Sequence, residues 1–197
     1  IINPEGNHAV CAGLTEEMNI NIKGHVGYYC AGMNQKAQIT IEGNVGTGVA
    51  ENMMSGKVHV KGNASQSAGA TAHGGLLIID GDASSRCGIS MKGIDIVVKG
   101  SVGHMSGFMS QSGNMVVCGD AGEALGDSLY ETNIYIRGKV KSLGADCIEK
   151  KMDKKHIKKL NLLLKEANIK NIKAESFKRY GSARKLYNFK IDNLSNY

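Results

Sequence analysis

Pairs of apolar residues, with one residue between the two members, recur along the chain every nineteen positions. The first members are Ile20, Ile39, Val58, Leu77, Ile96, Met115 and Ile134, and the second are Ile22, Ile41, Val60, Ile79, Val98, Val117 and Ile136. Apolar residues two apart are typical of a strand that buries one face, and Val and Ile suit such a surface. The residues between the members are mixed: Asn21, Thr40, His59, Ile78, Val97, Val116 and Tyr135. The pattern predicts one short strand per repeat.

A glycine stands two positions after each pair and keeps the same interval. These structural repeat glycines are Gly24, Gly43, Gly62, Gly81, Gly100, Gly119 and Gly138. Seven positions further on, every residue is very small: Ala31, Ala50, Gly69, Gly88, Gly107, Gly126 and Ala145, with Ala12 as the equivalent one coil earlier. Such a column indicates that neighbouring backbone lies close or that the backbone takes an unusual conformation there.

A nineteen-residue unit with one strand cannot bury a face alone, whereas stacked units share one continuous core. We therefore predict an all-β fold, a single-stranded, right-handed parallel β-helix of about seven 19-residue coils over residues 1–148, with residues 1–18 as an incomplete first coil. Equivalent residues of neighbouring coils then lie one strand spacing apart, about 4.7–4.9 Å.

Residues 149–197 form a separate, basic extension. Ile157, Leu160, Leu164 and Ala167 recur at helical spacing, with lysines on the opposite side. This predicts one helix that stops near Asn168 and covers the open end of the last coil, where an exposed strand edge invites aggregation.

The end of the extension is rich in aromatic residues and has two interpretations. It can dock onto a partner protein, or it can fold back onto the flank of the β-helix. The residues that we consider for docking are Phe177, Tyr180, Arg184, Tyr187 and Phe189.

The net charge of +6 is unevenly distributed. Residues 149–197 hold 14 of the 24 Lys and Arg but 5 of the 18 Asp and Glu, so this segment carries +9 and residues 1–148 carry −3. A basic segment can bind nucleic acid or an acidic protein, but nucleic-acid binding is not expected because no recognised module supports it.

No membrane span or signal peptide is evident, so we expect a cytoplasmic protein with reduced cysteines. Cys11, Cys30 and Cys87 share one repeat column that looks buried.

The sequence offers no catalytic, cofactor-binding or metal-binding constellation that we can defend. The loop Gly43–Gly48 lacks the spacing and the following helix of a phosphate loop, and the histidines show no ligand spacing. Serines in the corners are expected to bond to backbone. Surface residues at variable corner positions, which solenoids use for recognition, are Glu51, Arg86, Met105, Phe108 and Asp127.

Several motifs resemble the GXGXG domain at the C-terminus of the glutamate synthase large subunit. They are Gly100–Gly107, Gly119–Gly126, Ser106–Gly113, Gly122–Ser128, Ser142–Cys147 and Tyr180–Phe189. The whole chain is similar to the stand-alone form of that domain, which occurs in archaeal-type glutamate synthases and in methylamine–glutamate N-methyltransferase. A more distant resemblance is to one component of formylmethanofuran dehydrogenase.

The resemblance implies a non-catalytic β-helix scaffold that works in glutamate or N-methylglutamate biosynthesis. Its expected partners are a glutaminase-type amidotransferase subunit and an FMN-dependent synthase subunit, which would carry the FMN and an iron–sulfur cluster; no cofactor is expected in this chain. The resemblance does not separate these complexes. A component of formylmethanofuran dehydrogenase and a free-standing binding solenoid remain the alternatives.

Overall fold

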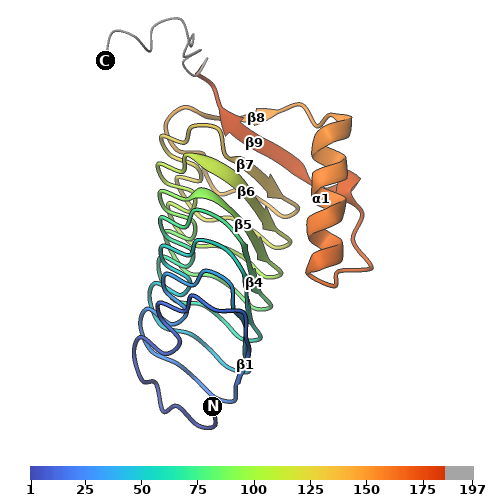
Figure 1. Ribbon diagram of the computed structural model, residues 1–197. Helices are drawn as coiled ribbons and strands as arrows, with labels where there is room; N and C mark the ends of the chain where they lie inside the picture. The colour runs from blue at the N-terminus through green and yellow to red at the C-terminus, as the bar shows by residue number, and fades with distance from the viewer. Residues whose placement is uncertain (185–197) are drawn as a thin grey trace, which may run out of the picture.

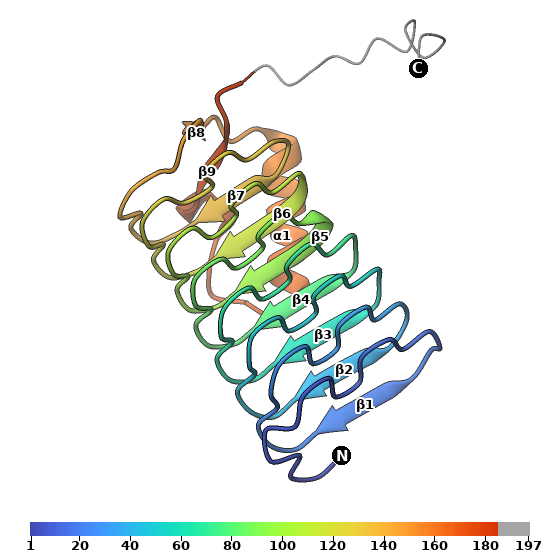
Figure 2. The same ribbon diagram turned by 90° about the vertical axis from the view of Figure 1, so that its left-hand side faces the viewer.

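The computed structural model describes residues 1–184, and its main feature is a stack of parallel strands, one from each coil (Figures 1 and 2). The strands are β1 (Asn19–Ile22), β2 (Gln38–Ile41), β3 (Lys57–Val60), β4 (Leu76–Ile79), β5 (Lys92–Val98), β6 (Ser112–Val117) and β7 (Asn133–Ile136). Consecutive strands are neighbours in one sheet. The prediction of a parallel β-helix is confirmed.

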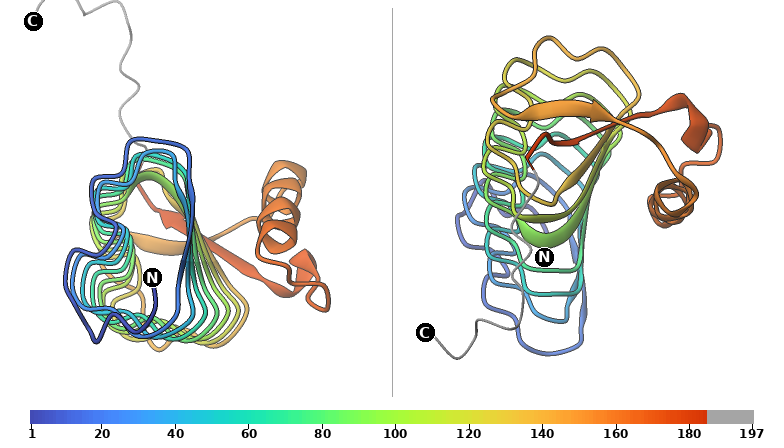
Figure 3. Two further views of the ribbon diagram at one scale, coloured as in Figure 1. Left: turned by 60° about the horizontal axis from the view of Figure 1, so that its bottom comes forward. Right: turned by 90° about the horizontal axis from the view of Figure 1, so that it is seen from above.

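The nineteen-residue interval sets the register of the sheet. Ile20 aligns with Ile39 and Ile22 with Ile41, and the same columns continue to β7. The side chains of both columns point into the solenoid, where nearly all of them are fully buried. Seen along its axis, the solenoid consists of closed coils that superpose on one another (Figure 3). The core is therefore a continuous apolar column enclosed by the coils.

A ladder of side-chain hydrogen bonds joins the coils directly after the repeat glycines. In each coil the residue that follows the glycine accepts a hydrogen bond from the backbone N–H of the equivalent residue in the next coil, at 2.7–3.0 Å. The accepting residues are His25, Asn44, Asn63, Asp82, Ser101 and Asp120. The ladder ends at Lys139, whose N–H donates to Asp120. Every one of the six side chains carries an acceptor atom, a regularity that the apolar pattern does not reveal.

This ladder explains why the repeat position before each accepting residue is glycine. The N–H of Gly100 donates to the carbonyl of Gly81 at 3.0 Å, and the same bond recurs along the column from Gly62 to Gly138. A Cβ on Gly100 would lie within 3.0 Å of both Asp82 Oδ1 and Gly81 O, closer than real Cβ atoms approach. Close approach of backbone and acceptor side chain therefore excludes any larger residue, in line with the role of glycine in packed strands.

The second column of small residues lies where the backbone takes a left-handed conformation. Ala31, Ala50, Gly69, Gly88, Gly107 and Gly126 all have φ between 56° and 74°, the left-handed region that costs a residue with a Cβ about 1–2 kcal/mol. Space is limited there too, because a Cβ on Gly107 would lie 2.7 Å from Cδ1 of Ile134. Of the two alternatives predicted for this column, the unusual backbone conformation is present at these six residues, and the close neighbour at Gly107 is a side chain rather than backbone. Ala145, predicted for the same column, is not left-handed; Asp146 is, at φ 60°.

The first coil is shifted by one residue in its corner. The N–H of Ala50 donates to Cys30 O, but the N–H of Ala31 donates to Val10 O, one residue before Cys11. Cys11 therefore occupies the left-handed position, with φ 59°, and is half-buried. The assignments of Cys11 to the Cys30 column and of Ala12 to the Ala31 column were wrong, because they assumed an unbroken interval of nineteen. Cys30 and Cys87 are fully buried as expected.

The C-terminal extension adds β8 (Cys147–Lys150), helix α1 (Lys154–Glu166), the 3₁₀ turn η1 (Ala174–Ser176) and β9 (Lys178–Ser182). Strand β9 runs antiparallel between β7 and β8 and so continues the sheet at its C-terminal end. Helix α1 lies beside the stack, against the outer face of the sheet (Figures 1 and 3). The expectation that the helix covers the open end was wrong, because the sheet continues there through β9 and β8.

Helix α1 itself agrees with the sequence pattern. Asp153 is the N-cap, and its side chain accepts hydrogen bonds from the N–H groups of Lys155 and His156. The helix ends at Glu166 with Ala167 as its C-cap, and Asn168 follows in the left-handed region at φ 56°. A left-handed residue after the last turn is a common helix ending, and Asn tolerates it.

Replacing Gly107 by Val tests the second small-residue column. The variant combines an unfavourable left-handed backbone with a collision against Ile134, so we expect its free energy of unfolding to fall by about 2–4 kcal/mol. Lys36→Ala, a change at an exposed site, is the control and should stay within about 0.5 kcal/mol of the parent. Equal thermal stability of the two variants would contradict the close stacking of coils at the second column of small residues.

Candidate functional site around helix α1

The middle column of the strands changes character along the stack. Asn21, Thr40 and His59 on β1–β3 are polar, whereas Ile78, Val97, Val116 and Tyr135 on β4–β7 are fully buried. The buried four form a second apolar cluster with Leu160, Leu163, Leu164 and Ala167 of α1 and with Ala174 and Phe177. Helix α1 therefore covers the coils whose outward side chains are apolar.

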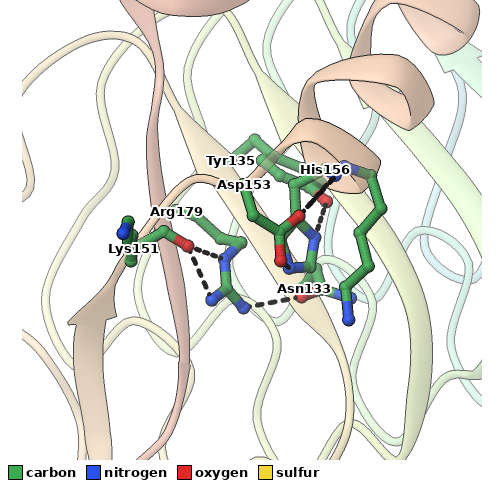
Figure 4. A network of polar contacts seen from close by, with 7 residues as sticks. Asn133, Tyr135, Lys151, Asp153, His156 and Arg179 are labelled. Atoms are coloured by element: carbon green, nitrogen blue, oxygen red, sulfur yellow. Dashed lines mark hydrogen bonds and ion pairs between the residues drawn. The ribbon is translucent and has the colours of Figure 1, made fainter.

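A polar network holds the N-terminal end of α1 on the sheet (Figure 4). The hydroxyl of Tyr135 and Nδ1 of His156 are hydrogen-bonded at 3.1 Å, and Nε2 of His156 lies 3.7 Å from Oδ2 of Asp153. Burial raises the pKa of Tyr135 to about 12. Burial, together with the nearby charge of Arg179, lowers the pKa of His156 below its ordinary value. The lowered pKa favours the neutral imidazole at neutral pH. With its proton on Nε2, the nitrogen nearer the Asp153 carboxylate, His156 accepts the Tyr135 hydroxyl hydrogen at Nδ1.

Arg179 of β9 completes the network. Its Nε and Nη2 donate to the carbonyl of Lys151 at 3.0 and 2.8 Å, and its Nη1 donates to Oδ1 of Asn133 at 3.0 Å. One guanidinium thus ties β9 to β7 and to the segment that leads into α1 (Figure 4). The planar fork of Arg suits this geometry, whereas a Lys could not make all three bonds.

Two ion pairs hold α1 further along the sheet. Lys159 Nζ lies 2.8 Å from Oδ2 of Asp95, whose other oxygen accepts from Asn114 Nδ2 at 2.8 Å. At the other end of the helix, Lys57 Nζ lies 3.4 Å from the carbonyl oxygen of Glu166 and 3.9 Å from its carboxylate. The helix is therefore fixed at both ends and in its middle across several coils.

A second cluster of charges lies near the C-terminal ends of β3, β4 and β5. Asp80 Oδ1 lies 2.8 Å from both His59 Nε2 and Lys99 Nζ, and Lys61 Nζ lies 3.7 Å from Oδ2. The pKa of Asp80 is lowered by its bonds to Lys99 and His59, and burial lowers the pKa of His59. Alternating charges on neighbouring strands satisfy one another, so we interpret this cluster as structural.

The chemistry available to these groups is limited. Burial raises the pKa of the Cys30 and Cys87 thiols to about 12, which keeps them protonated and poor nucleophiles. The Ser106 hydroxyl donates to the carbonyl of Gly103 at 2.9 Å, as expected for a corner serine. Within residues 1–184, no three His, Cys, Asp or Glu side chains gather closely enough to hold a metal ion.

The structure accounts for three of the five residues considered for docking. Phe177 and Tyr180 are buried, with 5% and 6% of their surface exposed. Phe177 packs under α1, and Tyr180 contacts the interior core. Arg184 forms an ion pair with Asp146. Tyr187 and Phe189 lie outside the described residues. The side chains of Phe177 and Tyr180 thus pack inside the chain, and docking through the end of the extension stays a prediction.

The variable corner residues are partly or fully exposed, as expected of a solenoid surface. Arg86 is exposed, and Glu51, Met105, Phe108 and Asp127 are half-buried. Asp127 is occupied locally, since its carboxylate accepts from the Ser128 hydroxyl at 2.8 Å and from the Ala145 N–H at 3.2 Å. In the described part of the chain, no helix has both the length and the apolar composition to cross a membrane.

His156 makes the attachment of α1 sensitive to pH. The folded protein holds the lowered-pKa imidazole neutral, while the unfolded chain takes up a proton near the ordinary value of 6.5. Stability should therefore be constant above that value, fall as pH decreases from 6.5 to the lowered pKa, and then level off. Unfolding should be monitored between pH 5 and 8. His156→Asn, which keeps an acceptor for Tyr135 but does not titrate, should show a smaller loss. His59→Gln is the control, because the pKa of His59 is also lowered. An unchanged pH profile in His156→Asn would refute the assignment of the pH dependence to His156.

Comparison with known proteins agrees with this geometry. The family model described as "GXGXG motif" matches residues 7–190. Protein GlxC of Rhizobium meliloti (strain 1021) is 62% identical over 71 residues, which are 36% of this chain and 31% of GlxC. The aligned stretch thus spans less than a third of that relative. Because the family model covers almost the whole chain, the chain belongs to the GXGXG family, the glutamate synthase-related family that its repeat motifs resemble.

Proposed function

We propose that the chain is a non-catalytic scaffold subunit of a glutamate synthase-type complex. The observation that carries this proposal is a regular solenoid of the GXGXG family whose buried thiols and polar network serve to hold the fold. The buried thiols have raised pKa values, and the polar network at Tyr135, His156 and Arg179 is occupied in holding α1. A stack of coils with one continuous core is a rigid body that suits the positioning of other subunits.

The partners in this proposal are a glutaminase-type amidotransferase and an FMN-dependent synthase subunit. The first releases ammonia from glutamine, and the second, with its FMN and iron–sulfur cluster, uses the ammonia in glutamate or N-methylglutamate biosynthesis in the cytoplasm. Ammonia transfer requires the two active sites to be held in a fixed relation, because precise positioning of reactants lowers the barrier. The solenoid supplies this fixed relation, and the cofactors reside on its partners.

Co-expression tests this function directly. The tagged chain should be produced with the amidotransferase and FMN subunits from the same genome and purified in one affinity step. We expect a stable complex that contains FMN and forms the amino-acid product from glutamine. Omitting the chain should leave glutaminase activity of the separate amidotransferase but abolish glutamine-dependent synthesis.

The control is Gly107→Val, which should fail to assemble if coil stacking positions the partners. Co-purification with molybdopterin-containing subunits instead would assign the chain to a formylmethanofuran dehydrogenase-like complex. Failure to bind either proposed subunit would refute the scaffold function.

A further inference from the structure

The outward side of helix α1 is predominantly basic. His156, Leu160, Leu163 and Leu164 face the sheet, and at 3.6 residues per turn the opposite side consists of exposed residues. We call this surface the basic face; it comprises Lys154, Lys155, Lys158, Asn161, Leu162 and Lys165. It contains no Asp or Glu; Glu166, whose side chain is 50% exposed, lies at its margin. A helix face that serves only to be solvated usually mixes both signs.

The chain itself does not neutralise these charges. Lys159 and Glu166, at the margins of the helix, pair with Asp95 and Lys57. The four lysines of the basic face form no ion pair with any residue in 1–184. The helix therefore uses its acidic and basic margins to attach to the sheet and presents unbalanced charge to the outside.

The placement of the lysines is unfavourable for the isolated chain. Lys154 and Lys158 are four residues apart, and Lys155 and Lys158 are three apart, so like charges lie side by side on one helix face. Lys154 and Lys155 also occupy the first turn, where the helix dipole favours anions, and that turn contains no acidic residue. The N-cap Asp153 offsets only part of this. An anionic partner would relieve both effects.

An apolar residue lies within the charged surface. Leu162 is 50% exposed, and lysines at Lys155, Lys158 and Lys165 surround it at helical spacing. A separate pocket of about 470 Å³ at the C-terminal end of α1 is lined by Asn161, Lys165, Ile169 and others. Apolar anchors inside a polar rim are typical of protein–protein interfaces.

We infer that the basic face docks onto an acidic protein surface that receives Leu162 in an apolar contact. This inference rests on the proposed function, because the acidic partner is taken to be a subunit of the same complex. A nucleic acid fits less well for two reasons. A phosphate backbone has no apolar surface for Leu162 to contact. The aromatic residues Phe177 and Tyr180 are buried and so cannot stack on bases.

A peptide probe tests this inference without the partner subunits. The probe is a fluorescent helical peptide of about 20 residues with glutamates around a central leucine, titrated with the full chain at about 0.1 M salt. We expect saturable binding that weakens about tenfold in Lys154→Gln/Lys158→Gln/Lys165→Gln. The matched control Lys23→Gln/Lys36→Gln/Lys139→Gln removes three exposed lysines elsewhere and should change binding by less than about twofold.

Leu162→Asn separates protein docking from general polyanion binding. It should weaken peptide binding several-fold and leave the binding of a DNA duplex of similar charge unchanged. Circular dichroism verifies that α1 is retained in each variant. Equal loss in the two triple variants, no effect of Leu162→Asn, tighter binding of the duplex than of the peptide, or no binding of the peptide to the parent chain would each overturn the inference. Since the co-expression experiment uses different proteins, failure of the scaffold function remains distinguishable from failure of this surface.

Discussion

The close approach of successive coils at the repeat glycines is the constraint on which the rest of the structure depends. Gly81 and Gly100 are joined by a backbone hydrogen bond at 3.0 Å, and the side chain of Asp82 fills the space where a Cβ would stand. This contact repeats with each coil and keeps every strand in the same register. The register in turn stacks equivalent apolar side chains into one interior column and equivalent outward side chains into one external column.

The external column then determines where the extension attaches. Helix α1 lies against Ile78, Val97, Val116 and Tyr135, and Tyr135 also supplies the hydroxyl that meets His156. Arg179 fixes β9 between β7 and β8, so the last coil ends in paired strands. The buried side of the helix is thereby fixed to the solenoid, while its lysines remain on the outer side. A rigid stack that carries a charged docking helix is consistent with the proposed role of positioning partner subunits.

Most of the solenoid could be predicted from the sequence because it is a sum of equal local units. The strand columns and the small residues at Gly107 and its equivalents carry the signal directly. Strict extrapolation failed at Cys11, where a one-residue shift in the corner leaves no trace in the apolar pattern. The site of α1 was also readable in principle, since the outward residue changes from polar at His59 to apolar at Ile78. The pairing of β9 could not be predicted from the sequence, because β9 is antiparallel, follows a helix and does not share the nineteen-residue pattern.

A double-mutant cycle on Gly100 and Asp82, followed by chemical unfolding, tests the central constraint most directly. Gly100→Ala should lower the free energy of unfolding by about 2–3 kcal/mol, and Asp82→Ala alone by about 0.5–1.5 kcal/mol, the value of a lost hydrogen bond. In the double variant the closest collision disappears, so we predict a total loss smaller than the sum by about 1 kcal/mol. Strictly additive losses, or a tolerated Gly100→Ala, would contradict the claim that close coil approach organises this fold.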